Sequence, residues 1–326
     1  MIDAFASEPH YAAHLRPIWE ALPVDVRGTF YAKPQASRML PGIETVCKYP
    51  KGSRLLLAAS AKDSVAYHRR PRVLLEHGAG QSYPGCQTLA RSPSYAGGDS
   101  HDGTVLFLCP NDVVAWRWRH AYPTVRSAVV GCPRLDVWHS TYRPPVDENR
   151  KPVVAVSFHW DASSLCPEAG WALPYFKEEL YQLAQLPDVH VLGHGHPRVY
   201  EGLLKDFYLK WGIEPVQNFD DVLDRADLYV IDNSSTAFEF ASTGRPILWL
   251  ESPEYRRDVH HGGRFWDWAD AGLHAHPGQL LNKVREALAD PAHVRVSREA
   301  VVSQVYAVRD GTSTARAVEE ILRVAG

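Results

Sequence analysis

The 326-residue sequence is poor in the features that mark secreted, membrane-spanning and metal-binding proteins. It has five cysteines, an odd number, and none stand in a CxxC or other metal-ligand spacing. Neither a disulfide framework nor a zinc site is therefore indicated, and single thiols of this kind are typical of a reducing compartment. No apolar run approaches membrane-spanning length, and the first residues carry no basic segment followed by an apolar core. We expect a cytoplasmic protein without signal peptide or transmembrane segment.

Excess charge and several catalytic signatures are also missing. The formal net charge is -3, which gives no electrostatic reason to expect nucleic acid or an anionic membrane as a standing partner. A nucleic-acid acceptor is not indicated, although it is left open. There is no Walker-type phosphate loop, no early GxGxxG with a following acidic residue, and no GxSxG elbow. These absences argue against P-loop NTPases, dehydrogenases and serine hydrolases respectively.

Short apolar strands alternate with helical patterns along the chain. In the first part, strands are expected at residues 28–32, 54–59, 72–76, 104–109 and 127–130. The alternation restarts later, with strands expected at residues 153–158, 189–192, 228–231 and 247–250. Helices are expected at residues 11–22, after 111–112, and at 173–186, 199–211, 279–289 and 312–324. This β-α alternation predicts an α/β fold with doubly wound parallel sheets.

A proline-rich, charged stretch at residues 142–152 interrupts the alternation and suits an exposed linker. We therefore expect an N-terminal domain at residues 1–143 and a C-terminal domain at residues 152–326. The last helix is assigned either to the second domain or to a position packed back on the first. Two such halves would face a central cleft, with ligands at the carboxyl ends of the strands.

The stretch from Val230 to Leu250 reads as strand, polar turn, helix and strand. A helix that begins at such a turn presents unpaired backbone N–H groups and hydroxyls at its positive end, which is a site for a phosphate. Glu239, four residues after Ser235, would lie on the same side and could accept hydrogen bonds from a ribose. Asp232 or Ser234 is equally consistent with an ordinary helix N-cap. The donor-binding candidates here are Asn233, Ser234, Ser235, Thr236 and Glu239.

Two further loops follow predicted strands. In the first, His77 precedes Gly78 and Gly80, and these glycines permit close backbone approach by a ligand. A neutral His77 could accept the proton of an acceptor hydroxyl, while a hydrogen-bonded structural histidine is the alternative. Gly78 and Gly80 are possible loop contacts.

The second loop carries His194, His196 and Arg198. A metal site is disfavoured because no third ligand stands nearby in the sequence. We prefer His196 and Arg198 as donors to a diphosphate, with His194 as a possible loop contact. A turn-rich loop with surface charges is the alternative interpretation.

The order of these motifs resembles the CDP-glycerol glycerophosphotransferase family, within the GT-B glycosyltransferase group. The resemblance covers about residues 75 to 324, and its most specific part is the block from Asp232 to Phe240. The matching segments are His77-Gly78, Val130-Gly-Cys-Pro-Arg-Leu-Asp136, Gly195-His-Pro197, Ala226 to Phe240, Arg245-Pro246 and Asp310-Gly-Thr-Ser313.

The resemblance implies two Rossmann-like domains of GT-B type, an acceptor on the N-terminal domain and a nucleotide-diphosphate donor on the C-terminal domain. Transfer would need no metal and no other cofactor. His77 stands where the family's candidate base lies, His196 at a donor-phosphate histidine, Ser234 and Ser235 at the phosphate-binding hydroxyls, and Glu239 at the acidic position. The sequence departs from the family pattern after His77-Gly78 and at Asn233.

We therefore predict a GT-B transferase that moves a glycosyl or polyol-phosphate group to an acceptor hydroxyl. The donor is a UDP-sugar or a CDP-linked group, and the acceptor is a glycan, a polyol or a modified base. Both reactions leave a nucleotide and need the same anion site, so the residues do not separate them. A sugar-nucleotide epimerase of the same fold and a non-catalytic nucleotide- or glycan-binding module are the alternatives.

Overall fold

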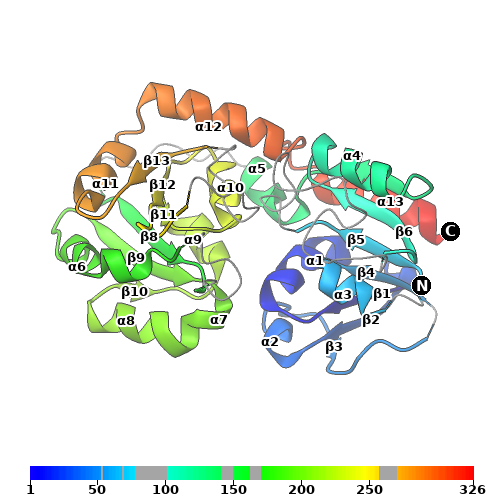
Figure 1. Ribbon diagram of the computed structural model, residues 1–326. Coiled ribbons are helices and arrows are strands. Elements are labelled where there is room, and N and C mark those ends of the chain that lie inside the picture. Colours follow the sequence, from blue (N-terminus) through cyan, green and yellow to red (C-terminus); the bar gives the residue numbers. More distant parts are fainter. Residues whose placement is uncertain (53, 68–69, 78–100, 141–149, 162–169, 257–269) are drawn as a thin grey trace. The chain divides into compact units, whose positions relative to one another are not determined.

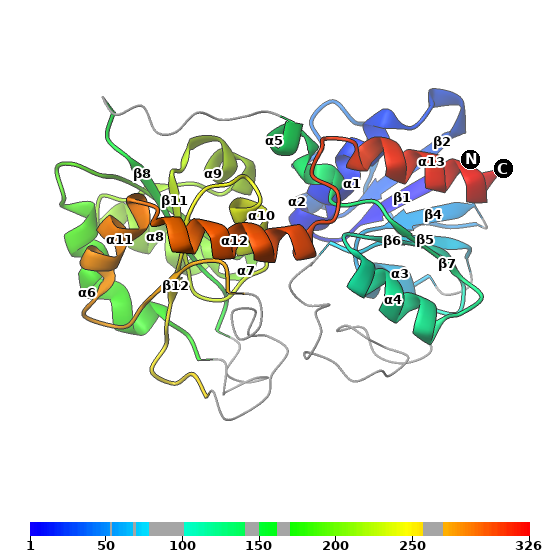
Figure 2. The ribbon, with the colours of Figure 1, turned by 90° about the horizontal axis from the view of Figure 1, so that it is seen from above.

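The structure, a computed structural model, describes residues 1–52, 54–67, 70–77, 101–140, 150–161, 170–256 and 270–326 (Figures 1 and 2). The chain divides into two compact units. Unit 1 comprises residues 1–141 together with 304–326, and unit 2 comprises residues 142–303. Most of the expected linker, residues 142–149, lies outside the described residues.

Unit 1 is built on a seven-stranded parallel sheet in the order β3-β2-β1-β4-β5-β6-β7. Its strands are β1 (Ile2–Ala6), β2 (Arg27–Ala32), β3 (Thr45–Val46), β4 (Leu55–Ala58), β5 (Arg72–Leu75), β6 (Thr104–Cys109) and β7 (Arg126–Val129). Its helical segments are α1 (Pro9–Ala21), η1 (Val24–Val26), α2 (Pro34–Ser37), α3 (Ala61–Val65), α4 (Asp112–Ala121), η3 (Pro133–Leu135), α5 (Asp136–Ser140) and α13 (Ser313–Ala325). The strand order runs outward from β1 in both directions, so the sheet has its topological switch point between β1 and β4.

Both faces of this sheet are buried, as the apolar strand sequences predict. Val73 and Leu75 lie on the face covered by α1 and α13, whereas Leu74 lies on the opposite face with α4. On that second face Phe107 stacks on Trp118 at a centroid distance of 4.1 Å. Neighbouring residues of one strand therefore pack into two different hydrophobic layers, one on each face of the sheet.

Strand β1, whose five residues include an aspartate, was not expected from the sequence. Asp3 is buried, and its carboxylate accepts a hydrogen bond from the guanidinium of Arg70 at 2.7 Å. A buried charge is tolerated when it is paired and hydrogen-bonded. Asp3 therefore sits in a central strand only because residues far along the chain supply its partners.

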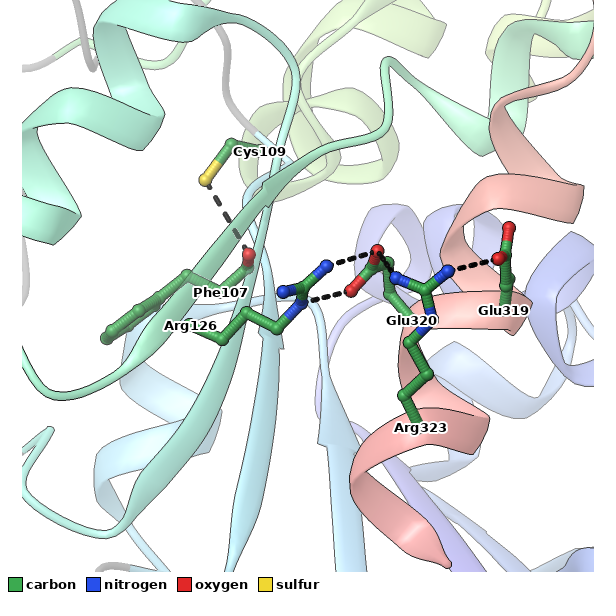
Figure 3. A network of polar contacts seen from close by, with 6 residues as sticks. All are labelled: Phe107, Cys109, Arg126, Glu319, Glu320 and Arg323. Carbon is green, nitrogen blue, oxygen red and sulfur yellow. Dashed lines mark hydrogen bonds and ion pairs between the residues drawn. The ribbon is translucent and has the colours of Figure 1, made fainter.

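The last helix, α13, belongs to unit 1 and is tied to β7 by charge. Figure 3 shows Arg126 of β7 and Glu320 of α13 joined by two hydrogen bonds, one of them 2.8 Å from Nη2 to Oε1. Glu320 also accepts from Arg323 at 3.0 Å. The start of the helix is held by Asp136, whose two carboxylate oxygens accept the backbone N–H groups of residues 313 and 314 at 3.0 and 2.6 Å.

Unit 2 has a six-stranded parallel sheet in the order β10-β9-β8-β11-β12-β13. Its strands are β8 (Val153–Phe158), β9 (His190–Gly195), β10 (Glu214–Pro215), β11 (Leu228–Ile231), β12 (Ile247–Leu250) and β13 (Leu273–Ala275). Its helical segments are α6 (Leu173–Ala184), α7 (Pro197–Val199), η5 (Tyr200–Leu204), α8 (Lys205–Lys210), α9 (Phe219–Arg225), α10 (Thr236–Ala241), α11 (Leu280–Leu288) and most of α12 (Ala292–Val305). The order reverses between β8 and β11.

Two expectations for unit 2 are corrected by the structure. The strand expected to end at Leu192 continues to Gly195, so His194 lies inside β9 and not in a loop. The single helix expected at residues 199–211 is divided, with the wide π-helical turn η5 between α7 and α8. This division buries Tyr200, Leu204 and Tyr208 together against the sheet.

The glycines of β9 explain how that strand continues. A Cβ atom on Gly193 would lie 2.3 Å from the ring of Tyr208, and one on Gly195 would lie 2.1 Å from Leu204. Tyr208 is fully buried, and its hydroxyl donates to the carbonyl oxygen of His194 at 2.7 Å. Glycine is therefore required here for side-chain packing against the strand.

We expect Gly193→Ala to lower the free energy of unfolding by about 1–3 kcal/mol, because a buried aromatic ring must move to admit the methyl group. Gly202→Ala is the matched control, since a Cβ atom there meets nothing within 4 Å. Denaturant unfolding of the two variants and the parent protein measures the difference. Equal stability of both variants would contradict this account of β9.

Candidate functional site

The carboxyl ends of β8, β9 and β11 meet at the switch point of unit 2. In open parallel sheets the loops at such a point form the usual ligand site. Here the loops begin at His159 after β8, His196 after β9 and Asp232 after β11. Two of the three histidine- and serine-containing loops expected from the sequence are therefore gathered at one edge of a single sheet.

Asp232 joins the ends of β8 and β11. Its Oδ1 accepts the backbone N–H groups of His159 at 2.8 Å and Asn233 at 2.7 Å, and the backbone of Ala172 also donates to this carboxyl. Burial raises the pKa of Asp232 to about 7, although these hydrogen bonds act in the opposite direction. The backbone N–H of Asn233 is therefore engaged internally, and only its side-chain amide could donate to a phosphate.

A chain of hydroxyl groups underlies the turn that follows β11. Thr236 donates to Ser234 Oγ through its backbone N–H at 3.3 Å and its hydroxyl at 3.0 Å. The Tyr229 hydroxyl lies 3.1 Å from Thr236 Oγ1, and because Thr236 has only one hydroxyl proton, Tyr229 must be the donor. Ser234 Oγ accepts twice and keeps its own proton, which can be donated to a ligand.

Ser235 and Glu239 complete the turn in different ways. Ser235 is the N-cap of α10 and makes no side-chain capping bond, and the N–H groups of Ser234 and Ser235 have no acceptor among the described residues. Helix α10 spans only six residues, so its macrodipole is small and these local donors matter more. Glu239 is buried in the first turn. Burial raises the pKa of Tyr229, and the charge of Glu239 adds to this rise.

His194 lies beneath the site and not on its surface. It is buried, its Nδ1 lies 3.0 Å from Ser157 Oγ, and its ring packs against Phe219 at a centroid distance of 5.4 Å. The contacts of His194 among the described residues are thus those of a structural histidine that supports β9.

His196 and Arg198 stand together after β9. The His196 Nδ1 accepts the backbone N–H of Arg198 at 3.2 Å. The Arg198 guanidinium lies over the Trp160 ring at 4.9 Å, and the His196 ring meets the His159 ring edge-on at 4.8 Å. The β8 loop therefore orients Arg198 through an aromatic face and His196 through an imidazole.

His159 and Trp160 were missed in the sequence, although a signal was present. Both directly follow the expected strand at residues 153–158, and that strand is the first of unit 2. The residues that follow the first strand of a doubly wound sheet border its switch point. Applying this rule to the segment after Phe158 would have placed both residues in the site.

In unit 1, His77 lies two residues after β5. Its ring hydrogen-bonds the backbone of Ala59, which follows β4, and contacts the rings of Tyr11 and His10 at 4.7 and 5.6 Å. His14 is 5.8 Å away. Burial lowers the pKa of His77 to about 4, so the ring is neutral near pH 7. Gly78 and Gly80 lie outside the described residues.

Beside the site, Glu251 follows β12 and is almost fully buried. Its Oε1 lies 2.6 Å from Nδ1 of His274 on β13, and the other ring nitrogen of His274 lies 3.0 Å from Asp270. Burial alone would lower the pKa of His274, but the two carboxylates outweigh it and raise the pKa to about 9. His274 is therefore a cation that holds Glu251 at this edge of the sheet.

Within the parts of the chain that the structure describes, no three histidine, cysteine or carboxylate side chains gather in a metal-binding group. Nor is any described helix both long enough and apolar enough to cross a bilayer.

The two parallel-sheet units and their similarity to solved structures define a GT-B fold. The wall teichoic acid polymerase TagF matches with a TM-score of 0.67 at 14% identity, over 99% of this chain and 88% of that one. A co-structure of S. aureus MnaA with UDP matches with a TM-score of 0.65 at 14% identity, over 99% and 96%. The UDP-GlcNAc 2-epimerase of Neisseria meningitidis matches with a TM-score of 0.58 at 11% identity, over 99% of both chains.

The family follows from the sequence. Residues 96–323 match the model of CDP-glycerol:poly(glycerophosphate) glycerophosphotransferases, and the chain belongs to this family of transferases. The predicted resemblance and the predicted fold class are thus both confirmed. No curated protein matches the chain closely enough to add to this assignment.

We expect the protein to lose stability at alkaline pH through His274. Because the pKa is raised in the folded state, the contribution is complete below the unfolded value of 6.5 and disappears as pH rises through about 9. His274→Gln can still donate a hydrogen bond but carries no charge, so it should lose about 2 kcal/mol less than the parent between pH 7 and pH 10. Denaturant unfolding at both pH values measures this, and equal losses would show that His274 is not held as a cation.

Proposed function

We propose that the protein moves a glycosyl or polyol-phosphate group from a nucleotide-diphosphate donor to an acceptor hydroxyl. The donor binds at the carboxyl edge of unit 2, and the acceptor binds unit 1. The observation that carries the proposal is the meeting of His196, Arg198 and the Ser234–Ser235 turn around one switch point, linked through His159 and Asp232.

The groups at this edge have the chemistry that a diphosphate requires. The N–H groups of Ser234 and Ser235 and the hydroxyl proton of Ser234 supply neutral donors, while Arg198 supplies a permanent positive charge. His196 donates from Nε2, because its Nδ1 accepts the N–H of Arg198. As the bond to the donor breaks, negative charge grows on the leaving diphosphate, and donors already fixed in place stabilise it.

The class of donor is supported by the relatives. The family is described by the transfer of glycerophosphate from CDP-glycerol, and structures of similar fold include a TagF variant soaked with CDPG and MnaA with UDP. We therefore propose a CDP-linked donor or a UDP-sugar. We propose that the buried Glu239, one turn into α10, accepts hydrogen bonds from the ribose hydroxyl groups.

We propose His77 as the general base on the acceptor side. The ring is neutral near pH 7 and can take the hydroxyl proton as the new bond forms. Burial makes this imidazole a weak base, so the imidazolium that results needs a nearby anion. We propose that transfer needs no metal and no bound cofactor, as the resemblance to the family implies.

Ser234→Ala should weaken binding of the donor nucleotide about tenfold, because it removes a hydrogen bond to a charged oxygen. Ser297→Ala is the control, since among the described residues that exposed hydroxyl donates only to the carbonyl oxygen of residue 270, at 3.3 Å. Calorimetric titration with CDP-glycerol and with UDP-GlcNAc measures both variants. Unchanged affinity in Ser234→Ala would remove the turn after β11 from the site.

His77→Ala should lower the transfer rate by about 10²- to 10⁴-fold and leave donor affinity nearly unchanged. His120→Asn, an exposed histidine of α4 in the same unit, should leave both quantities unchanged. Rates are measured as nucleotide release in the presence of acceptor. A parallel loss of donor binding would show that His77 binds substrate and does not act as the base. Conversion of the donor to an isomer without acceptor would instead establish an epimerase.

A further inference from the structure

His159 is the residue at which the three loops of the unit 2 site meet. Its backbone N–H donates to Asp232 after β11, and its carbonyl oxygen accepts the indole N–H of Trp171 at 2.9 Å. Its ring meets that of His196 at 4.8 Å. The main chain of His159 is therefore fixed on both sides, and the ring is placed beside the proposed phosphate donors.

The hydrogen bonds of the two rings determine which nitrogen carries the proton in each. The Nδ1 of His159 lies 3.1 Å from the carbonyl oxygen of Trp160. A carbonyl can only accept, so Nδ1 carries the hydrogen and the neutral ring has a bare Nε2. In His196 the Nδ1 accepts an N–H, so Nε2 carries the hydrogen. The neighbouring rings are thus opposite tautomers.

This difference matters for anion binding. His196 can donate from Nε2 to a phosphate oxygen while neutral. The bare Nε2 of His159 would present a lone pair to the same oxygen, which is repulsive, and it becomes a donor only after gaining a proton. No hydrogen bond occupies this Nε2 among the described residues.

We propose that His159 is a donor-binding residue, and that binding of the nucleotide diphosphate is coupled to uptake of one proton at its Nε2. The inference rests on the proposed donor site and extends it. The proton adds a positive charge beside Arg198 only when the ligand is present.

The charges that face His159 are consistent with this coupling. Burial and the positive charge of Arg198 oppose protonation in the free protein, where the pKa of His159 is lowered to about 4. The pKa of His196 is lowered to about 3 by burial, His159, Arg198 and His194. Asp232 is the carboxyl group packed against this loop, and its oxygens are already engaged by backbone N–H groups. A bound diphosphate would bring the negative charge that the ring needs.

The test is a count of protons taken up on binding. CDP-glycerol and UDP-GlcNAc are suitable probes because their diphosphate diesters have no ionisable proton near neutral pH. Calorimetric titrations at one pH near 6, in two buffers of different ionisation enthalpy, give the number of protons taken up. We expect close to one proton per bound donor, and a Kd that rises by up to tenfold for each unit of pH above the pKa of the free ring.

Three variants test whether the His159 ring is the group that takes up the proton. His159→Asn keeps a neutral donor but cannot titrate, so binding should be weaker, with no proton uptake and a flat pH dependence. His196→Asn should weaken binding and retain the uptake, and His293→Asn on the exposed start of α12 should change neither.

Donor binding to the parent protein without proton uptake would overturn the coupling and leave the proposed function standing. If the His159→Asn protein still takes up a proton on donor binding, a group other than His159 gains that proton. If neither probe binds the parent protein, both this inference and the proposed function fail. The parent measurement decides the coupling even if the His159→Asn protein does not fold.

Discussion

The site of unit 2 depends on one buried carboxylate, that of Asp232, which accepts backbone N–H groups from two strand ends. Removing a carboxylate from water is costly unless hydrogen bonds replace its hydration, so the β8 and β11 loops are held in the arrangement that satisfies it. Unit 1 uses the same device at its own switch point. There Asp63 of α3 accepts the backbone N–H of Ser7, which follows β1, at 2.8 Å. In each unit, a buried acid fixes the geometry of the edge where ligands of such sheets bind.

The direction of the hydrogen bonds supports the proposal that this edge of unit 2 binds an anion. Tyr229 donates to Thr236 and Thr236 donates to Ser234, so every proton in the chain points toward the turn. The buried phenol holds the pair without competing for a ligand. Arg198 is stacked on Trp160, so little side-chain freedom remains to be lost on binding. Preorganised donors of this kind cost less to align during a reaction than flexible ones.

Much of this architecture is encoded locally, and the exceptions share a cause. The strands at residues 104–109, 153–158 and 228–231 have the predicted ends because their apolar runs are bounded by glycine, proline or polar residues. Strand β1 was not predicted, and its Asp3 is stabilised by Arg70, which is far away in the sequence. The length of β9 was underestimated, and its Gly193 makes room for the ring of Tyr208, which is also distant in the sequence. The hydroxyls after β11 were identified from the turn itself. The proposed role of His159 follows from its place after the first strand of unit 2, and not from the residues immediately around it.

The segments that resemble the family include residues that hold the fold and residues of the proposed donor site. Asp136 caps α13 through the N–H groups of its first turn. Arg245 donates to the last carbonyls of α9, those of Leu223 and Ala226, at 2.6 Å each. Arg245 also donates to the Thr243 hydroxyl at 2.8 Å. A ligand would have to break several hydrogen bonds to use either side chain. Ser234 keeps a free proton after its internal bonds are made. Similarity to the family motifs is therefore found for both kinds of residue, and their hydrogen bonds distinguish one kind from the other.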